Sequence, residues 1–135
     1  MNAVDTNVLI YAKDARYPQK QSQAISLIDN LQDGVLLWQV ACEFMAASHK
    51  LAPLGYNRGE AWKEVQRLRL IWHTAVPDWQ VLDRAELLFA RFSLSQWDAM
   101  LVAACLEAGV TTLYSEDLTA YPRIDTLQIL NPFTP

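Results

Sequence analysis

Short apolar runs alternate along the chain with longer segments in which apolar side chains recur every three to four residues. The short runs predict buried strands, and the longer segments predict helices with one buried face. We expect strands at residues 3–5, 35–37, 74–76, 112–114 and 127–130. We expect helices at residues 7–12, 18–32, 39–50, 58–72, 79–92 and 96–108. Strands and helices that alternate in this way are typical of an α/β domain with a mainly parallel central sheet.

The composition fits one compact domain. The chain has 135 residues, which is enough for a single domain over residues 1–135 and too few for two ordinary ones. Hydrophobic residues make up 52% and charged residues 19%, so a core can form. No apolar run approaches the ~20 residues of a membrane helix, and no secretory signal stands at the N-terminus. Because Cys42 and Cys105 lie in apolar helical patterns, we expect reduced, buried thiols in a cytoplasmic protein.

One segment is basic on an acidic chain. The net charge of −4 does not by itself indicate a nucleic-acid-binding protein. Residues 49–73, however, contain five basic and two acidic residues. The basic residues are Lys50, Arg58, Lys63, Arg67 and Arg69. They form either a solvated helix face or a surface that contacts the phosphates of RNA.

Two acidic residues follow predicted strands. Asp5 closes the first strand within an otherwise apolar stretch, and Asp117 comes soon after the strand that ends at Tyr114. Ligands of open parallel sheets gather at the carboxyl ends of the strands, so these acids are candidates for one site. Each also has a simpler interpretation, Asp5 as the cap of the helix that follows and Asp117 as a turn residue.

Two further acids belong to apolar helices. Glu43 is the only charged residue between residues 35 and 48, and no basic residue lies within helical reach. It therefore needs a partner from elsewhere in the fold, either in a buried ion pair or at a shared site. Asp98 stands three residues after Ser95, which is the spacing of a capping box. The helix behind Asp98 is apolar all round, so the acid is either a plain cap or a ligand held at the start of a buried helix.

Four carboxylates that meet without a cation repel one another, which raises some of their pKa values. A hard divalent ion such as Mg²⁺ or Mn²⁺ removes this repulsion because it prefers oxygen ligands. No His or Cys lies at the spacing of a zinc site. The acids therefore indicate a Mg²⁺ or Mn²⁺ site for phosphoryl chemistry with metal-activated water.

Several stretches together resemble the PIN-domain family, and within it the small bacterial VapC-like toxins of type II toxin–antitoxin pairs. The stretches are Asp5-Thr6-Asn7-Val8-Leu9-Ile10-Tyr11, Val40-Ala41-Cys42-Glu43-Phe44, Trp97-Asp98-Ala99, Leu113-Tyr114-Ser115-Glu116-Asp117-Leu118 and Leu130-Asn131-Pro132-Phe133. The resemblance implies a Rossmann-like three-layer α/β/α domain, an acidic Mg²⁺ or Mn²⁺ site and endoribonuclease activity on RNA. It also implies homodimers and inhibition by a cognate antitoxin.

The resemblance also implies roles for individual residues. The catalytic and metal-binding positions match Asp5, Glu43, Asp98 and Asp117. The polar residues that support them match Thr6, Asn7 and Ser115, and Glu116 is a second candidate beside Asp117.

Two other functions compete with this interpretation. A non-catalytic PIN-like module would bind a partner helix in a groove, and one helical stripe offers apolar side chains for such a groove or for the core. The stripe consists of Trp62, Val65, Leu68 and Trp72. A haloacid-dehalogenase-like phosphatase would have a second Asp two residues after the first, where this chain has Asn7.

Overall fold

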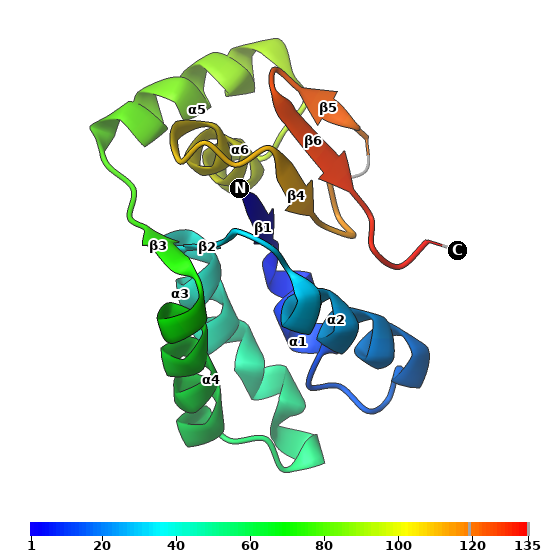
Figure 1. Cartoon of the computed structure of the whole chain (residues 1–135). Helices are drawn as coiled ribbons and strands as arrows, with labels where there is room; N and C mark the ends of the chain where they lie inside the picture. Colours follow the sequence, from blue (N-terminus) through cyan, green and yellow to red (C-terminus); the bar gives the residue numbers. More distant parts are fainter. Residues whose placement is uncertain (119, 135) are drawn as a thin grey trace.

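The computed structural model describes residues 1–118 and 120–134. Within these residues, six strands form one sheet in the order β3-β2-β1-β4-β6-β5 (Figure 1). All neighbouring strands are parallel except β5 and β6. The strands are β1 (Asn2–Val4), β2 (Gly34–Leu37), β3 (His73–Ala75), β4 (Thr112–Tyr114), β5 (Arg123–Ile124) and β6 (Leu127–Leu130).

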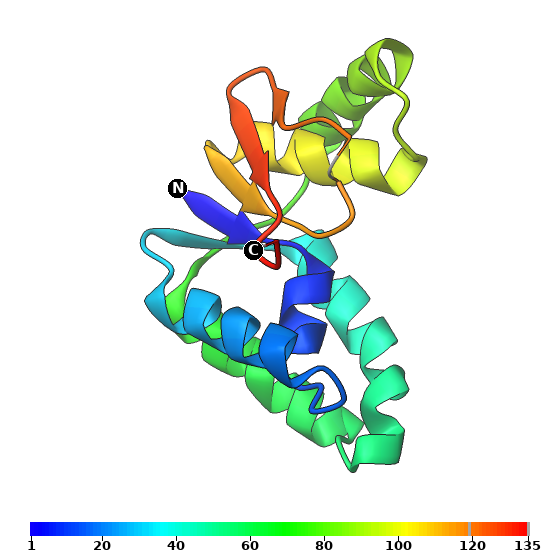
Figure 2. The same cartoon turned by 90° about the vertical axis from the view of Figure 1, so that its right-hand side faces the viewer.

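Helices cover both faces of the sheet, as Figures 1 and 2 show. The helices α5 and α6 lie on one face, and the helices from α1 to α4 lie on the other. The α-helices are α1 (Thr6–Tyr11), α2 (Pro18–Asn30), α3 (Trp38–Ala47), α4 (Arg58–Ile71), α5 (Trp79–Arg91) and α6 (Gln96–Glu107), and a 3₁₀ helix, η1, spans Ser48–Leu54. The predicted α/β class with a mainly parallel central sheet is therefore confirmed.

The register of the central strands brings two chain segments to the same edge. Val4 of β1 lies opposite Tyr114 of β4, so the next residues, Asp5 and Ser115, leave the sheet side by side. The Asp5 amide donates to the Tyr114 carbonyl at 2.9 Å, which extends the ladder to the acid. The register thus places Asp5 next to the segment that carries Asp117.

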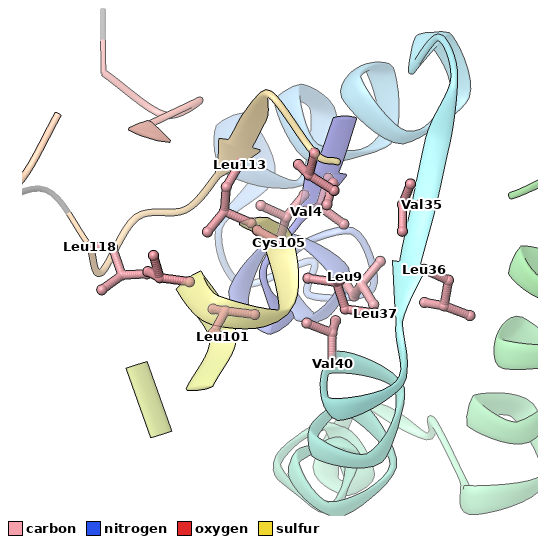
Figure 3. Close-up of a cluster of buried hydrophobic side chains, with 14 of the residues drawn as sticks. Val4, Leu9, Val35, Leu36, Leu37, Val40, Leu101, Cys105, Leu113 and Leu118 are labelled. Atoms are coloured by element: carbon pink, nitrogen blue, oxygen red, sulfur yellow. The ribbon is translucent and has the colours of Figure 1, made fainter. Parts of the chain in front are cut away.

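Buried side chains from both faces hold this edge rigid. Figure 3 shows the cluster that packs around β1, with side chains from the strands, α1, α3 and α6. Leu113, Val40 and Cys105 are fully buried in it, and Leu9 is 2% exposed. Burial of such side chains supplies about 25 cal/mol for each Å² of apolar surface removed from water.

The structure departs from the sequence-based expectations in a few places. The expected helix at residues 39–50 ends at Ala47 and continues as a 3₁₀ helix that contains Pro53. The two-residue strand β5 was not predicted, and Asp125, with a φ of 51°, joins it to β6. Cys105 is buried as expected, but Cys42 is exposed because its side of α3 faces away from the core. No helix in the described ranges is long and apolar enough to cross a membrane.

Candidate active site

Asp5 is held by hydrogen bonds from two segments of the chain. Its Oδ1 atom accepts from the backbone amide of Thr6 at 2.7 Å, which caps α1. Its Oδ2 atom accepts from the hydroxyl of Ser115 at 2.8 Å. Asp5 is only 7% exposed. The helix-cap interpretation is therefore confirmed, and it leaves a buried carboxylate fixed at the sheet edge.

Glu43 is also held by hydrogen bonds. The Thr6 hydroxyl donates to Oε2 at 3.0 Å, and the Gln39 side-chain amide donates to Oε1 at 3.0 Å. The same amide nitrogen lies 3.1 Å from the carbonyl oxygen of Trp97, so it ties α3 to the start of α6. Among the described residues Glu43 forms no ion pair, and the alternative of a buried salt bridge is wrong.

Asp117 is placed by the two polar residues expected to support it. The Asn7 side-chain amide donates to Oδ2 of Asp117 at 3.1 Å. The Ser115 hydroxyl oxygen accepts from the Asp117 backbone amide at 3.1 Å. Ser115 therefore contacts both Asp5 and Asp117, and it is completely buried between them.

Asp98 lies in the first turn of α6. Ser95 is the N-cap residue, and its hydroxyl accepts from the Asp98 backbone amide at 3.1 Å. The backbone of Asp98 thus takes part in the cap, while its half-buried carboxylate interacts electrostatically with the charges of Asp117 and Glu43. Asp98 can therefore take part in the helix cap with its backbone while its carboxylate contributes to the site.

The four acids form an electrostatically coupled group, here called the acidic cluster: Asp5, Glu43, Asp98 and Asp117. Burial raises the pKa of Asp5 from 3.8 to about 6, and the charges of Glu43 and Asp117 add to the rise. Burial, followed by the charges of Asp117 and Glu43, also raises the pKa of Asp98. Both shifts have the sign expected when carboxylates share a site without a cation.

The donor set fits a hard divalent ion. The acidic cluster offers only oxygen atoms, and within residues 1–118 and 120–134 none of its members is paired with Lys or Arg. Oxygen-only sites suit Mg²⁺ or Mn²⁺. In the described part of the chain, no three acidic, imidazole or thiol groups already lie close enough together to hold one ion. Small side-chain movements would therefore have to accompany binding.

A sequence model of the PIN domain matches residues 3–126, which is most of the chain. The chain belongs to the PIN domain family. A comparison with curated proteins gives no match.

Solved structures show the same fold at low sequence identity. A toxin–antitoxin complex from Klebsiella pneumoniae has a TM-score of 0.71 and 14% identity, with 98% of both chains covered. VapC20 from Mycobacterium tuberculosis, a sarcin–ricin loop cleaving toxin, has a TM-score of 0.70 and 16% identity over 95% of this chain and 99% of that one. VapBC-1 from nontypeable Haemophilus influenzae has a TM-score of 0.68 and 15% identity over 98% of both chains.

Glu116 of this PIN domain has partners outside the acidic cluster. Its carboxylate forms an ion pair with Lys20, whose ammonium also lies 3.3 Å from the Tyr11 hydroxyl. Burial alone would raise the pKa of Glu116, but the hydrogen bonds from Lys20 and Tyr11 and the charge of Lys20 outweigh it and lower the pKa. The carboxylate that contacts the Asn7 side chain is therefore that of Asp117, whereas the Glu116 carboxylate contacts Lys20.

The five basic residues predicted as RNA contacts do not form one patch. Arg67 pairs with Glu64 at 2.6 Å and lines a hollow with Ile28, whereas Arg69 lines a different hollow with Trp38. The Arg58 side chain reaches the carbonyl of Met45 near the end of α3. Side chains two residues apart on a helix point in different directions, which explains why a basic segment is not a basic surface.

One basic side chain from outside this segment reaches the backbone of η1. The Arg16 guanidinium donates to the Lys50 carbonyl at 3.4 Å, although it also pairs with the buried Asp14. Lys50 is exposed and lies seven residues after Glu43. Arg16 has no local signal in the sequence, because it lies 34 residues before its η1 partner.

The predicted groove along α4 is wrong in part. Val65, Leu68 and Trp72 are buried in the core, and only Trp62 of that stripe is exposed, by 52%. An apolar hollow of about 450 Å³ lies beside Trp62, between α3, α4 and the edge strand β3. Its lining residues include Trp38, Cys42, Met45, Trp62, Val65 and Val76.

Proposed function

We propose that this PIN domain is a divalent-metal-dependent endoribonuclease and the toxin of a toxin–antitoxin pair. The observation that carries the proposal is the acidic cluster: Asp5 and Asp117 follow the carboxyl ends of β1 and β4, and Glu43 and Asp98 interact electrostatically with them. Among the described residues, no Lys or Arg is paired with any of the four. Ligands of open parallel sheets bind at such strand ends. The similar fold of VapC20, a sarcin–ricin loop cleaving toxin, supports RNA as the substrate.

The acidic cluster would hold Mg²⁺ or Mn²⁺, and the bound ion would lower the pKa of a water molecule and neutralise charge on the phosphate. The surrounding residues keep the carboxylates in place. Thr6 and Gln39 hold Glu43, and Ser115 holds Asp5 while it fixes the backbone of Asp117. A carboxylate of the cluster would accept a proton from the attacking water as the water oxygen forms a bond to phosphorus. The bond from phosphorus to the leaving sugar oxygen would break, and that oxygen would take up a proton from solvent, giving a phosphate monoester and a hydroxyl group.

Cleavage of a defined RNA with purified variants tests the proposal. Asp5→Asn and Asp98→Asn should each abolish cleavage while the fold remains intact, and a chelator should abolish cleavage by the wild type. Asp83→Asn is the matched control, because Asp83 is an exposed acid in α5 that does not belong to the acidic cluster. Equal cleavage by the wild type, Asp5→Asn and Asp98→Asn would contradict the proposal.

The partners proposed for this chain are RNA, a cognate antitoxin and a second copy of the chain. The structure from Klebsiella pneumoniae with the same fold is a toxin–antitoxin complex, which supports an antitoxin as partner. Large exposed apolar side chains such as Trp79 and Val76, 78% and 70% exposed, suit contacts with protein. Light scattering of the purified chain alone measures whether it forms a homodimer. Light scattering with the product of an adjacent short gene measures whether it binds an antitoxin.

A non-catalytic module remains the second candidate, and the apolar hollow beside Trp62 favours it. The two functions differ in their response to metal, because a ligand of the folded state must stabilise that state. A titration with Mn²⁺ followed by thermal unfolding separates them. Stabilisation that Asp5→Asn removes supports the nuclease, and no stabilisation at millimolar Mn²⁺ supports the module.

A further inference from the structure

A basic side chain lies directly behind the loop that presents Asp117. Lys20 projects from α2 and pairs with Glu116, the residue before Asp117. Its ammonium also contacts the Tyr11 hydroxyl at 3.3 Å and lies 4.7 Å from the centre of the Tyr11 ring. These contacts join α1, α2 and the segment after β4.

The C-terminal end of the chain completes the same cluster. The ring of Phe133 lies edge-on to the ring of Tyr11, with 5.0 Å between ring centres, and 5.7 Å from the Lys20 ammonium. A hydrogen bond from the Phe133 amide to the Asn131 side chain shapes the turn that brings this ring back. The partly exposed Lys20 side chain therefore has two aromatic rings and one carboxylate as neighbours.

The backbone between Ser115 and Asp117 is held from two sides. On one side, the Glu116 amide donates to the Asn7 side chain at 3.4 Å, and the Asp117 amide donates to the Ser115 hydroxyl. On the other side, the Glu116 carboxylate is held by its ion pair with Lys20 and by a hydrogen bond from the Tyr11 hydroxyl. Release of Glu116 would leave an uncompensated carboxylate next to the acidic cluster, free to compete for the same space and the same cation.

We propose that Lys20 is a positioning residue of the metal site. It binds Glu116 against Tyr11 and Phe133, so that Glu116 stays out of the acidic cluster and Asp117 faces it. The inference rests on the proposed nuclease function, and it adds that a residue of α2 with no contact to the cluster controls cation affinity. The same geometry assigns Glu116 as the partner of Lys20 rather than as a metal ligand.

The primary experiment measures the dissociation constant of Mn²⁺ by calorimetry on the full chain. Lys20→Met should raise this constant three- to tenfold, whereas Lys20→Arg should stay within twofold of the wild type. Lys13→Met is the matched control, because Lys13 has similar exposure and pairs with Glu64 on α4, away from the acidic cluster. The control should leave Mn²⁺ affinity unchanged.

A double-mutant cycle separates positioning from direct ligation. If Lys20 acts by holding the Glu116 carboxylate, the effects of Lys20→Met and Glu116→Gln are not additive: without that carboxylate the loss of Lys20 has no further effect, and the double variant binds Mn²⁺ as Glu116→Gln does. Multiplied effects of the two substitutions would show that Glu116 is itself a ligand, which overturns the proposal.

A measurement without metal tests whether Lys20 holds the backbone at Glu116 and Asp117 in place. Hydrogen exchange of the Glu116 and Asp117 amides, followed by NMR, should be faster in Lys20→Met than in Lys13→Met. Unchanged exchange and unchanged Mn²⁺ affinity in Lys20→Met would overturn the proposal. If Lys20→Met lowered RNA affinity and left Mn²⁺ affinity unchanged, the proposal would also be overturned, since Lys20 would then be a substrate contact. Absence of Mn²⁺ binding in the wild type would instead refute the proposed function, and the inference would fall with it.

Discussion

The buried carboxylate of Asp5 should make the metal-free protein less stable at neutral pH than at mildly acidic pH. In the folded state its pKa is raised from 3.8 to about 6, mainly by burial. The folded chain therefore keeps this proton in a pH range where the unfolded chain has lost it. Between about pH 4 and pH 6 the unfolded state binds fewer protons, so the free energy of unfolding falls as the pH rises.

The size of this change in the free energy of unfolding follows from the pKa shift of Asp5. A rise in pKa from 3.8 to about 6 corresponds to about 3 kcal/mol at pH values above both constants. About 1 kcal/mol of this loss falls between pH 5 and pH 7, because the folded form is still losing its proton there. Asp5→Asn removes the titration but also disturbs the hydrogen bond from Ser115, at a cost of about 1 kcal/mol. The variant should therefore be the more stable protein at pH 7 by about 1 to 2 kcal/mol.

Urea unfolding followed by tryptophan fluorescence, with a chelator present, measures this difference, and the chain has five Trp residues as probes. The quantity to compare is the change in the free energy of unfolding from pH 5 to pH 7, wild type against Asp5→Asn. Other titrating groups contribute to both proteins and cancel in the comparison. Equal pH dependence in the two proteins would refute the reasoning. Mn²⁺ at a hundred times its dissociation constant should add about 2.7 kcal/mol to the wild type at pH 7.

Two further predictions concern the fold and the substrate surface. Gly34→Ala should lower the free energy of unfolding by about 1 to 3 kcal/mol, because an added Cβ would lie 2.4 Å from the buried Trp72 ring. The control Gly59→Ala, measured in the same urea titration, should change the free energy of unfolding by less than about 1 kcal/mol. Lys50→Gln should raise the KM for RNA several-fold with little change in kcat. Arg67→Gln should leave KM unchanged, because Arg67 is paired with Glu64. Steady-state cleavage kinetics at two salt concentrations measure both variants, and equal effects on KM would contradict the role of Lys50 as the RNA contact.

Two acids of the candidate site, Asp5 and Glu43, have a local signal in the sequence. Asp5 interrupts an apolar stretch, and Glu43 is isolated on an apolar helix, so sequence alone shows that each needs a partner. The strand that carries Asp5 and the strand before Asp117 could also be predicted, since short apolar runs between helices are typical of parallel strands. The register of β1 with β4 then brings them together.

The remaining features depend on contacts between distant segments. Gln39 holds Glu43 and bridges to the Trp97 carbonyl, but a glutamine at the start of a helix carries no signal of its own. The pairing of Lys20 with Glu116 joins residues 96 positions apart. The exposure of Cys42 was mispredicted for a related reason: its helix is mostly apolar, so the sequence could not show which side faces the core.

Asp98 shows why local chemistry alone left two interpretations open. Its position after Ser95 is that of a capping box, in which the acid returns to the start of the helix. In the structure the Ser95 hydroxyl accepts from the Asp98 amide, so the cap uses the backbone of Asp98 and leaves the carboxylate beside Glu43 and Asp117. Burial and these two charges raise its pKa, as they do for Asp5, and both residues are harder to ionise without a cation. A cation that removes this repulsion gains binding energy from it, so the feature that destabilises the metal-free fold should also strengthen metal binding.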